Sequence, residues 1–246
     1  MIWPFAKKKN KIELFVRHCH FSAISGHKKR IPNLTREICF ENLLQTIQGE
    51  EVNVTFLLDT FHPMESAHFV KAQQQFPVVE IREGTESGSF LRLLEYVDSL
   101  KLDPETIVYF LEDDYMHKKG WPAVLREGFT IPGVDYVTLY DHKDKYFLES
   151  YTDLRSKIFL TESSHWRSTP STTNTFATRF KTLQRDMQIQ RSYSENVKIS
   201  KDHEKFCALA ERGAVLISPM PGWSTHTELA YASPCVDWEK IVDVKK

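Results

Sequence analysis

The sequence lacks a long apolar run, has few cysteines and carries almost no net charge. No apolar run reaches the roughly 20 residues that a membrane-spanning helix needs, so none is expected. The 4 cysteines among 246 residues lie far apart without a CxxC pair, which argues against a zinc cluster or a disulfide framework and favours reduced thiols in the cytoplasm. A formal charge of -1 provides no global field for nucleic acid, so we expect no nucleic-acid partner and specificity from a local site.

Positive charge is concentrated at the amino terminus, where residues 1–11 read MIWPFAKKKNK. Such runs usually form solvated tails, and this interpretation is preferred. The alternative is weak peripheral docking to the inner face of a membrane, with Trp3 and Phe5 at the interface and the lysines near anionic headgroups. We expect a basic tail over 1–11, one folded domain over 12–240 and a short tail over 241–246.

The first half alternates short apolar runs with helical patterns. Strands are expected at 12–16, 52–59, 77–81 and 106–112, and helices at 34–49, 65–76 and 87–100, the first of them capped by Thr35. Such alternation predicts an α/β fold with a mainly parallel, mixed sheet flanked by helices. Ligands of these sheets bind beyond the carboxyl ends of the strands, where this chain places several polar stretches.

The second half is less regular. A strand is expected at 134–141, helices at 177–190 and 200–213, and a late strand at 214–219. The intervening segment 157–180 is rich in hydroxyl groups and is predicted to form strands or loop. Without a repeat or a long linker, one domain is expected.

Three consecutive carboxylates, Glu112, Asp113 and Asp114, follow the fourth expected strand. One of them would suffice to cap a helix in the next segment, 117–129. Adjacent acids repel one another unless a cation compensates them, and a hard divalent ion prefers a few carboxylates together with water and phosphate oxygens. A metal site is therefore preferred to a helix cap.

An apolar strand that ends in EDD, preceded by two strand–helix units with Asp59 closing the second strand, resembles the GT-A fold glycosyltransferases, in particular family 2-like enzymes with a DxD motif. The resemblance implies a Rossmann-like GT-A sheet in a single domain. It also implies that residues 12–115 bind a nucleotide sugar and that residues 116–240 bind the acceptor.

The resemblance further implies a Mn²⁺ or Mg²⁺ ion. Asp114 would be a ligand of this ion, and Asp113 would contact the ribose or the sugar of the donor. Glu112 replaces the first aspartate of the motif, which leaves open which acid touches the metal directly. GT-A enzymes often draw another ligand from a histidine near the carboxyl terminus, and His226 fits this position, although a loop histidine can equally be incidental.

Four residues fit the donor side of the same resemblance. Asp59 would hydrogen-bond the nucleoside, or simply cap its loop. Gly84 would permit close backbone approach to the donor. Ser89 would meet an anion at a helix start, or be an ordinary N-cap. Arg17 would contact phosphate, with a solvated loop as the alternative.

Inverting sugar transfer needs a carboxylate that takes a proton from the acceptor hydroxyl. Asp202 and Glu204 stand at the start of a late helix, where such enzymes place this base; Asp202 is preferred, and the alternative is that both merely favour a helix N-terminus. For the acceptor, Trp166 offers a platform for a sugar ring, while Arg167 and Thr173 offer hydrogen bonds. A buried tryptophan beside an ordinary loop is the alternative.

The combined hypothesis is a metal-dependent glycosyltransferase of polysaccharide biosynthesis. It would move a sugar from a nucleotide-diphosphate donor, UDP-sugars being favoured, to a glycan or a lipid-linked saccharide. Two alternatives stay open. A sugar nucleotidyltransferase commonly carries a glycine-rich basic loop after its first strand, whereas residues 17–30 contain a single glycine. A catalytically silent carbohydrate-binding scaffold would bind nucleotide without turnover.

Overall fold

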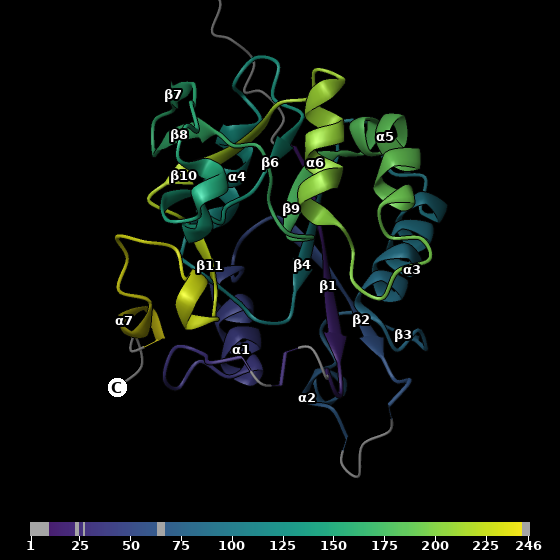
Figure 1. The fold of residues 1–246 in the computed structure, drawn as a ribbon. Helices are drawn as coiled ribbons and strands as arrows, with labels where there is room; N and C mark the ends of the chain where they lie inside the picture. Colours follow the sequence, from purple (N-terminus) through teal and green to yellow (C-terminus); the bar gives the residue numbers. More distant parts are fainter. Residues whose placement is uncertain (1–9, 23–24, 27, 63–66, 243–246) are drawn as a thin grey trace, which may run out of the picture.

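The computed structural model describes residues 10–22, 25–26, 28–62 and 67–242 (Figure 1). The expected membrane contact of the basic tail falls on residues 1–9, outside these ranges, and remains a prediction. In the described part of the chain, every helix is too short or too polar to cross a bilayer.

A mixed sheet of nine strands forms the centre of the fold, in the order β3-β2-β1-β4-β9-β6-β10-β8-β7 (Figure 1). Strands β3, β2, β1 and β4 are mutually parallel, β9 runs antiparallel to both β4 and β6, and β10 is parallel to β6. The strands β8 and β7 extend the sheet in antiparallel fashion. Their bounds are β1 Ile12–Cys19, β2 Val52–Asp59, β3 Val78–Ile81, β4 Ile107–Glu112, β6 Tyr136–Val137, β7 Ile158–Leu160, β8 His165–Ser168, β9 Phe176–Arg179 and β10 Leu216–Met220.

Helices cover both faces of this sheet. The apolar residues of α1 and α4 pack against one face, and those of α3, α5 and α6 pack against the other. The helix bounds are α1 Arg36–Thr46, α2 Phe69–Ala72, α3 Glu86–Ser99, α4 Trp121–Gly128, α5 Phe180–Ser192, α6 Asp202–Glu211 and α7 Trp238–Val242. Short 3₁₀ helices, labelled η, lie at Lys143–Tyr146, Glu149–Tyr151 and Leu229–Tyr231. The predicted α/β class, with a mixed sheet between helices, is confirmed.

Helix starts follow local capping chemistry. Thr35 accepts a hydrogen bond of 3.2 Å from the Ile38 amide, which confirms it as the N-cap of α1. Thr85 caps α3 in the same way, accepting from the Gly88 amide at 3.0 Å. Ser89 therefore lies in the second turn of α3 rather than at its start, so the predicted anion contact at a helix terminus is not available to it.

The helix expected at 65–76 is reduced to α2, within the described residues. The Gln73 side chain both accepts from the Phe76 amide and donates to the Phe76 carbonyl, at 2.8 Å each. These bonds stabilise a turn that competes with helix, and Pro77 favours an extended conformation at Phe76. The turn closed by the Gln73 side chain therefore ends the helix early, in spite of the helical periodicity of residues 65–76.

The strand expected at 134–141 is also shorter, ending at Val137. Beyond it, the Leu139 carbonyl accepts hydrogen bonds from the amides of Trp223 and Ser224, both at 2.9 Å. The chain thus leaves the main sheet and pairs with a late segment through the isolated bridge between Tyr140 and Ser224.

A small second sheet pairs β5, Tyr115–His117, with β11, Ser224–His226, in antiparallel fashion. Because β5 directly follows the EDD turn, the next helix begins only after Gly120, whose φ of 87° places it in the left-handed region. The three carboxylates are therefore not caps of α4, and the alternative of a helix cap is wrong.

Candidate functional site

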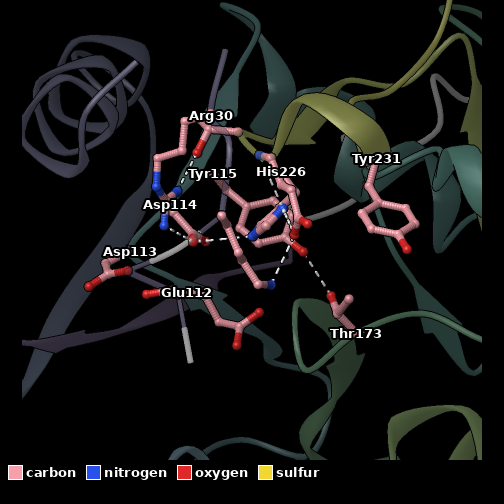
Figure 2. Close-up of polar contacts among 12 residues, drawn as sticks. Arg30, Glu112, Asp113, Asp114, Tyr115, Thr173, His226 and Tyr231 are labelled. Carbon is pink, nitrogen blue, oxygen red and sulfur yellow. Dashed lines mark hydrogen bonds and ion pairs between the residues drawn. The ribbon is translucent and has the colours of Figure 1, made fainter. Parts of the chain in front are cut away.

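The candidate site lies at the carboxyl ends of the parallel strands. Glu112 ends β4, and Asp113 and Asp114 form the turn into β5. All three carboxylates have low exposure: Asp113 and Asp114 are buried, and the Glu112 side chain is 27% exposed. Figure 2 shows Asp114 directed towards Arg30 and His226. The strand-end position predicted for the polar site is thus the one observed.

Each carboxylate of this turn is paired with its own arginine. The nitrogen–oxygen distances are 3.1 Å for Arg17 and Glu112, 3.3 Å for Arg36 and Asp113, and 3.0 Å for Arg30 and Asp114. Guanidinium groups therefore supply part of the positive charge that adjacent acids require. Sequence reasoning missed two of these arginines: Arg30 lies in the basic loop that follows β1, which was the available signal, and Arg36 is the first residue of α1.

Arg17 is held between β4 and α3. Besides Glu112, it donates to the Glu86 carbonyl and to Ser89 Oγ, both at 2.9 Å, and it lies 3.0 Å from the Glu86 carboxylate. Burial opposes its charge, but the two glutamates dominate and raise the pKa of Arg17. The predicted loop arginine is thus a buried ion-network residue, and Ser89 serves as its hydrogen-bond acceptor.

The three adjacent acids differ in their ionisation. Burial raises the pKa of Glu112 to about 7, against the opposing effect of Arg17. Burial likewise raises the pKa of Asp113 to about 6, with Arg36 opposing. For Asp114, burial is outweighed by His226 and Arg30, which hold the pKa of its carboxyl well below the usual range. Asp114 is therefore the most firmly ionised acid of the turn.

His226 reaches Asp114 through the small sheet. Antiparallel pairing places His226 opposite Tyr115, the residue after Asp114, and the Thr227 amide donates to the Asp114 carbonyl at 3.0 Å. The His226 imidazole Nε2 then lies 3.1 Å from Asp114 Oδ2 (Figure 2). Burial lowers the pKa of His226, but the charge of Asp114 raises it by more, so the pKa of His226 is above its ordinary value. Two residues 112 positions apart in the chain thus meet, as the sequence predicted.

The Asp114–His226 pair fits part of a divalent metal site. Two ligands about 2.1 Å from one octahedral ion are about 3.0 Å apart, which matches the 3.1 Å between these atoms. Among the described residues no group of three or more His, Cys, Asp or Glu side chains is arranged to hold a metal. An ion here would therefore take two protein ligands and depend on water and phosphate for the others.

Asp59 organises the loop after β3. Its carboxylate accepts from the amides of Phe61 and Glu83, at 3.0 and 3.2 Å, and from Gly84 at 2.8 Å. Gly84 has a φ of 70°, and a Cβ at this position would lie 2.6 Å from the Phe61 ring. The loop-capping interpretation of Asp59 therefore describes these contacts, and the loop it shapes faces the strand ends where donor contact is predicted.

Asp202 begins α6 beside the Arg17 network. Its side chain is 25% exposed, and Oδ1 lies 3.6 Å from the Lys205 Nζ, too far for a hydrogen bond and without another partner in the described part of the chain. Burial raises the pKa of Asp202 to about 6, with Lys205 opposing and Glu86 reinforcing the shift. Glu204, in contrast, is exposed to solvent.

Lys205 was not foreseen as a site residue. It is fully buried, donates to Asn174 Oδ1, and places its ammonium 4.5 Å from the Phe90 ring and 5.2 Å from the Phe176 ring. Aromatic faces stabilise such a cation. Its position one turn after Asp202 was the signal in the sequence that could have indicated the pair.

The three predicted acceptor residues have different surroundings. Trp166 is 0% exposed in the core between α4 and the sheet, so the prediction that a sugar ring stacks on it is wrong. Arg167 is also buried and pairs with Asp141 at 2.8 Å. Thr173 remains half-buried near the site, where its Oγ1 lies 2.9 Å from the Tyr115 hydroxyl (Figure 2).

Replacing Trp166 tests its structural role. Trp166→Ala is expected to lower the free energy of unfolding by about 3–5 kcal/mol, because it removes a large buried ring and leaves a cavity. Urea denaturation measures this loss. Trp166→Phe, which keeps most of the ring, should lose much less, and a stable Trp166→Ala variant that binds sugar poorly would instead restore the platform role.

Comparisons with known proteins identify no family for this chain. No family model matches the sequence, and no curated protein matches it. Solved structures that resemble the fold include the following two. The first, 4-diphosphocytidyl-2C-methyl-D-erythritol synthase from Anaerococcus prevotii, shares 11% identity over 95% of this chain and 94% of that one, with a TM-score of 0.45. The second, CMP:2-keto-3-deoxy-manno-octonic acid synthetase in complex with CTP, shares 16% identity over 87% of this chain and 92% of that one, with a TM-score of 0.46. The function is argued below from the site itself.

Proposed function

We propose that this protein is a glycosyltransferase that transfers a sugar from a nucleotide-diphosphate donor, with UDP-sugars favoured, to a hydroxyl of a glycan or lipid-linked saccharide. The observation that carries the proposal is Asp202. Its carboxylate Oδ1 is unpartnered among the described residues and its pKa is about 6, close to what a general base at neutral pH requires. Its negative charge also raises the pKa of Arg17 and of Glu112.

In this proposal residues 12–115 bind the donor and residues 116–240 the acceptor. Arg30 and Arg36 lie beside the carboxylates at the strand ends, where they would bind the donor diphosphate. Asp113 would accept a hydrogen bond from the ribose or the sugar. Asp114 and His226 would hold Mn²⁺ or Mg²⁺, which when bound supplies Lewis-acid stabilisation of the diphosphate.

Asp202 would act on the acceptor. Its carboxylate takes the proton of the acceptor hydroxyl while the hydroxyl oxygen attacks the anomeric carbon, and the bond from that carbon to the diphosphate oxygen breaks. The products are the elongated saccharide with an inverted anomeric centre and a nucleoside diphosphate. Lys205 keeps the Asp202 carboxylate ionised near neutral pH, since its charge opposes the effect of burial.

A sugar nucleotidyltransferase is the second candidate. The observation that favours it is the basic loop after β1, from which Arg30 reaches Asp114, with Lys28 paired to Glu228 nearby. Basic groups at this position suit a nucleoside triphosphate. Asp202 has no assigned role in that reaction, so we rank it second.

The released product distinguishes the two reactions. The protein is incubated with UDP- and GDP-sugars plus saccharide acceptors, and separately with nucleoside triphosphates plus sugar phosphates, each with manganese. Release of nucleoside diphosphate, together with a longer saccharide, supports glycosyl transfer. Release of pyrophosphate supports the second candidate. Nucleotide binding without either product contradicts both and favours the silent scaffold.

A further inference from the structure

A cavity of about 520 Å³ lies beside the two 3₁₀ helices at 143–151, away from the acidic turn. Tyr146, Phe147 and Tyr151 line it together with Leu154 and Arg167. Its volume lies within the range of about 300–1,000 Å³ that is usual for small-molecule sites. None of the residues assigned above to the donor, the metal or the base lines this cavity.

The cavity offers aromatic faces that are open to solvent. Tyr146 and Phe147 are 54% and 53% exposed, although both are large apolar rings. Buried rings would be expected if they served only the core, as the neighbouring Trp166 does. Exposed rings at the mouth of a cavity suit a flat ligand with C–H groups on one face, such as a pyranose.

The charged residues that line the cavity, Lys145 and Arg167, are hydrogen-bond donors, and each is paired with an aspartate that neutralises its charge. Arg167 is 5% exposed and pairs with Asp141, and its buried Nε has no partner in the described part of the chain. Lys145 is likewise buried and pairs with Asp144 at 2.9 Å. Neither Asp141 nor Asp144 lines the cavity, so the cavity wall presents the two cations and not their paired carboxylates. A neutral, hydroxyl-bearing ligand matches this lining better than a free anion or a hydrocarbon chain.

The cavity is linked through Tyr151 to the helix turn that contains the proposed base. The Tyr151 hydroxyl lies 3.0 Å from Nδ1 of His203 and 3.2 Å from Ser171 Oγ. His203 follows Asp202 in the first turn of α6. Tyr151, which forms one wall of the cavity, is therefore hydrogen-bonded to the first turn of α6, the turn that also carries Asp202.

We propose that this cavity is the acceptor site and that it binds a neutral sugar ring, stacked on Phe147 and Tyr146 and hydrogen-bonded by Arg167. The assignment rests on the proposed glycosyl transfer, because it places the acceptor next to the helix turn that begins with Asp202. It replaces Trp166 as the aromatic platform with two rings that are exposed. Arg167 lines the cavity and was already predicted from the sequence as an acceptor residue.

Binding can be tested without turnover. Saturation-transfer-difference NMR is recorded with the methyl glycosides of glucose, galactose, mannose and N-acetylglucosamine. We expect at least one of them to receive saturation, and Phe147→Ala and Tyr146→Ala each to weaken its binding by about tenfold, the loss of one stacking contact. Leu160→Ala is the control, since Leu160 is an apolar residue 71% exposed on the edge strand β7 and outside the cavity.

The outcomes separate this inference from the proposed function. Octyl glucoside is included, and saturation confined to its alkyl protons would assign the cavity to an apolar chain and overturn the proposal. Sugar binding that is unchanged in both aromatic variants also overturns it. If sugar binds as expected but no donor is turned over, the cavity stands and the glycosyl transfer fails. In an active enzyme, both aromatic variants should raise the KM for the acceptor.

Discussion

Asp202→Asn is expected to abolish transfer and, at the same time, to make the protein more stable at neutral pH. An asparagine cannot take the acceptor proton, and loss of a general base typically costs about 10²–10⁴-fold in rate. Product release under saturating donor, followed with the purified variant, measures this loss. In the wild type the rate should rise with pH through about 6, because the carboxylate must be ionised and burial raises its pKa to about 6.

The gain in stability follows from the direction of the same shift. A carboxyl whose pKa is higher in the folded protein than in the unfolded chain makes folding less favourable as it ionises. This penalty is absent below about pH 4 and complete above about pH 6. The neutral amide avoids it, and because the side chain is 25% exposed we expect a gain of only about 1–2 kcal/mol at pH 7.

Glu204→Gln is the matched control. Glu204 was the alternative base in the sequence, belongs to the same helix turn and is exposed. It should change neither the rate nor the melting temperature by a measurable amount. A Glu204→Gln variant without activity, beside an active Asp202→Asn variant, would exchange the two roles. If both variants are active, the base is another group and the inverting mechanism is not supported.

The sequence predicted the parallel half of the fold because each strand and helix there is specified locally. Periodicity located β1 to β4 and the helices α1 and α3, although not the extent of α2, and a parallel sheet then brought the ends of β1, β2 and β4 to one edge. The EDD turn could be placed at that edge without any knowledge of tertiary contacts.

Contacts between segments that are distant in the chain could not be predicted from the sequence. Arg30, which compensates Asp114, comes from a loop without regular periodicity, and Arg36, which compensates Asp113, is the first residue of α1, so only their charge was visible in the sequence. The burial of Trp166 depends on the order in which β8 joins β10, which no local pattern encodes. The sequence could therefore indicate that Trp166 is an aromatic residue near the site, but it could not indicate whether Trp166 is exposed or buried.

Asp114→Asn is expected to abolish both turnover and the stabilisation by manganese, with the opposite effect on intrinsic stability to that of Asp202→Asn. In the wild type, manganese with the correct nucleotide should raise the melting temperature by mass action. The amide is a poor ligand for a divalent ion compared with a carboxylate, so this shift should vanish. Thermal shift with UDP, GDP and CMP, with and without manganese, measures it.

In EDTA the same variant reports on the ion pairs alone. Because His226 and Arg30 hold the pKa of Asp114 below its usual range, Asp114 stabilises the fold above about pH 4, and this contribution is lost as the pH falls through the lowered pKa. The Asn variant leaves Arg30 and His226, whose side chains are 20% and 13% exposed, without their anion, which should cost about 3 kcal/mol at pH 7. Asp153→Asn, at an exposed position, controls for loss of charge alone.

Opposite stability effects in two inactive variants would distinguish a site from a structural ion network. If Asp114 only neutralised Arg30 and His226, its replacement would destabilise the fold, yet the manganese and nucleotide shifts of the surviving folded protein would persist. If Asp202 only paired with Lys205, its replacement would destabilise rather than stabilise, and turnover would survive. If Asp202 is a base that lacks hydrogen-bond partners and Asp114 is a ligand held in place by ion pairs, both variants lose turnover, but Asp202→Asn is more stable and Asp114→Asn is less stable than the wild type. Two carboxylates that served only the fold would not give this combination.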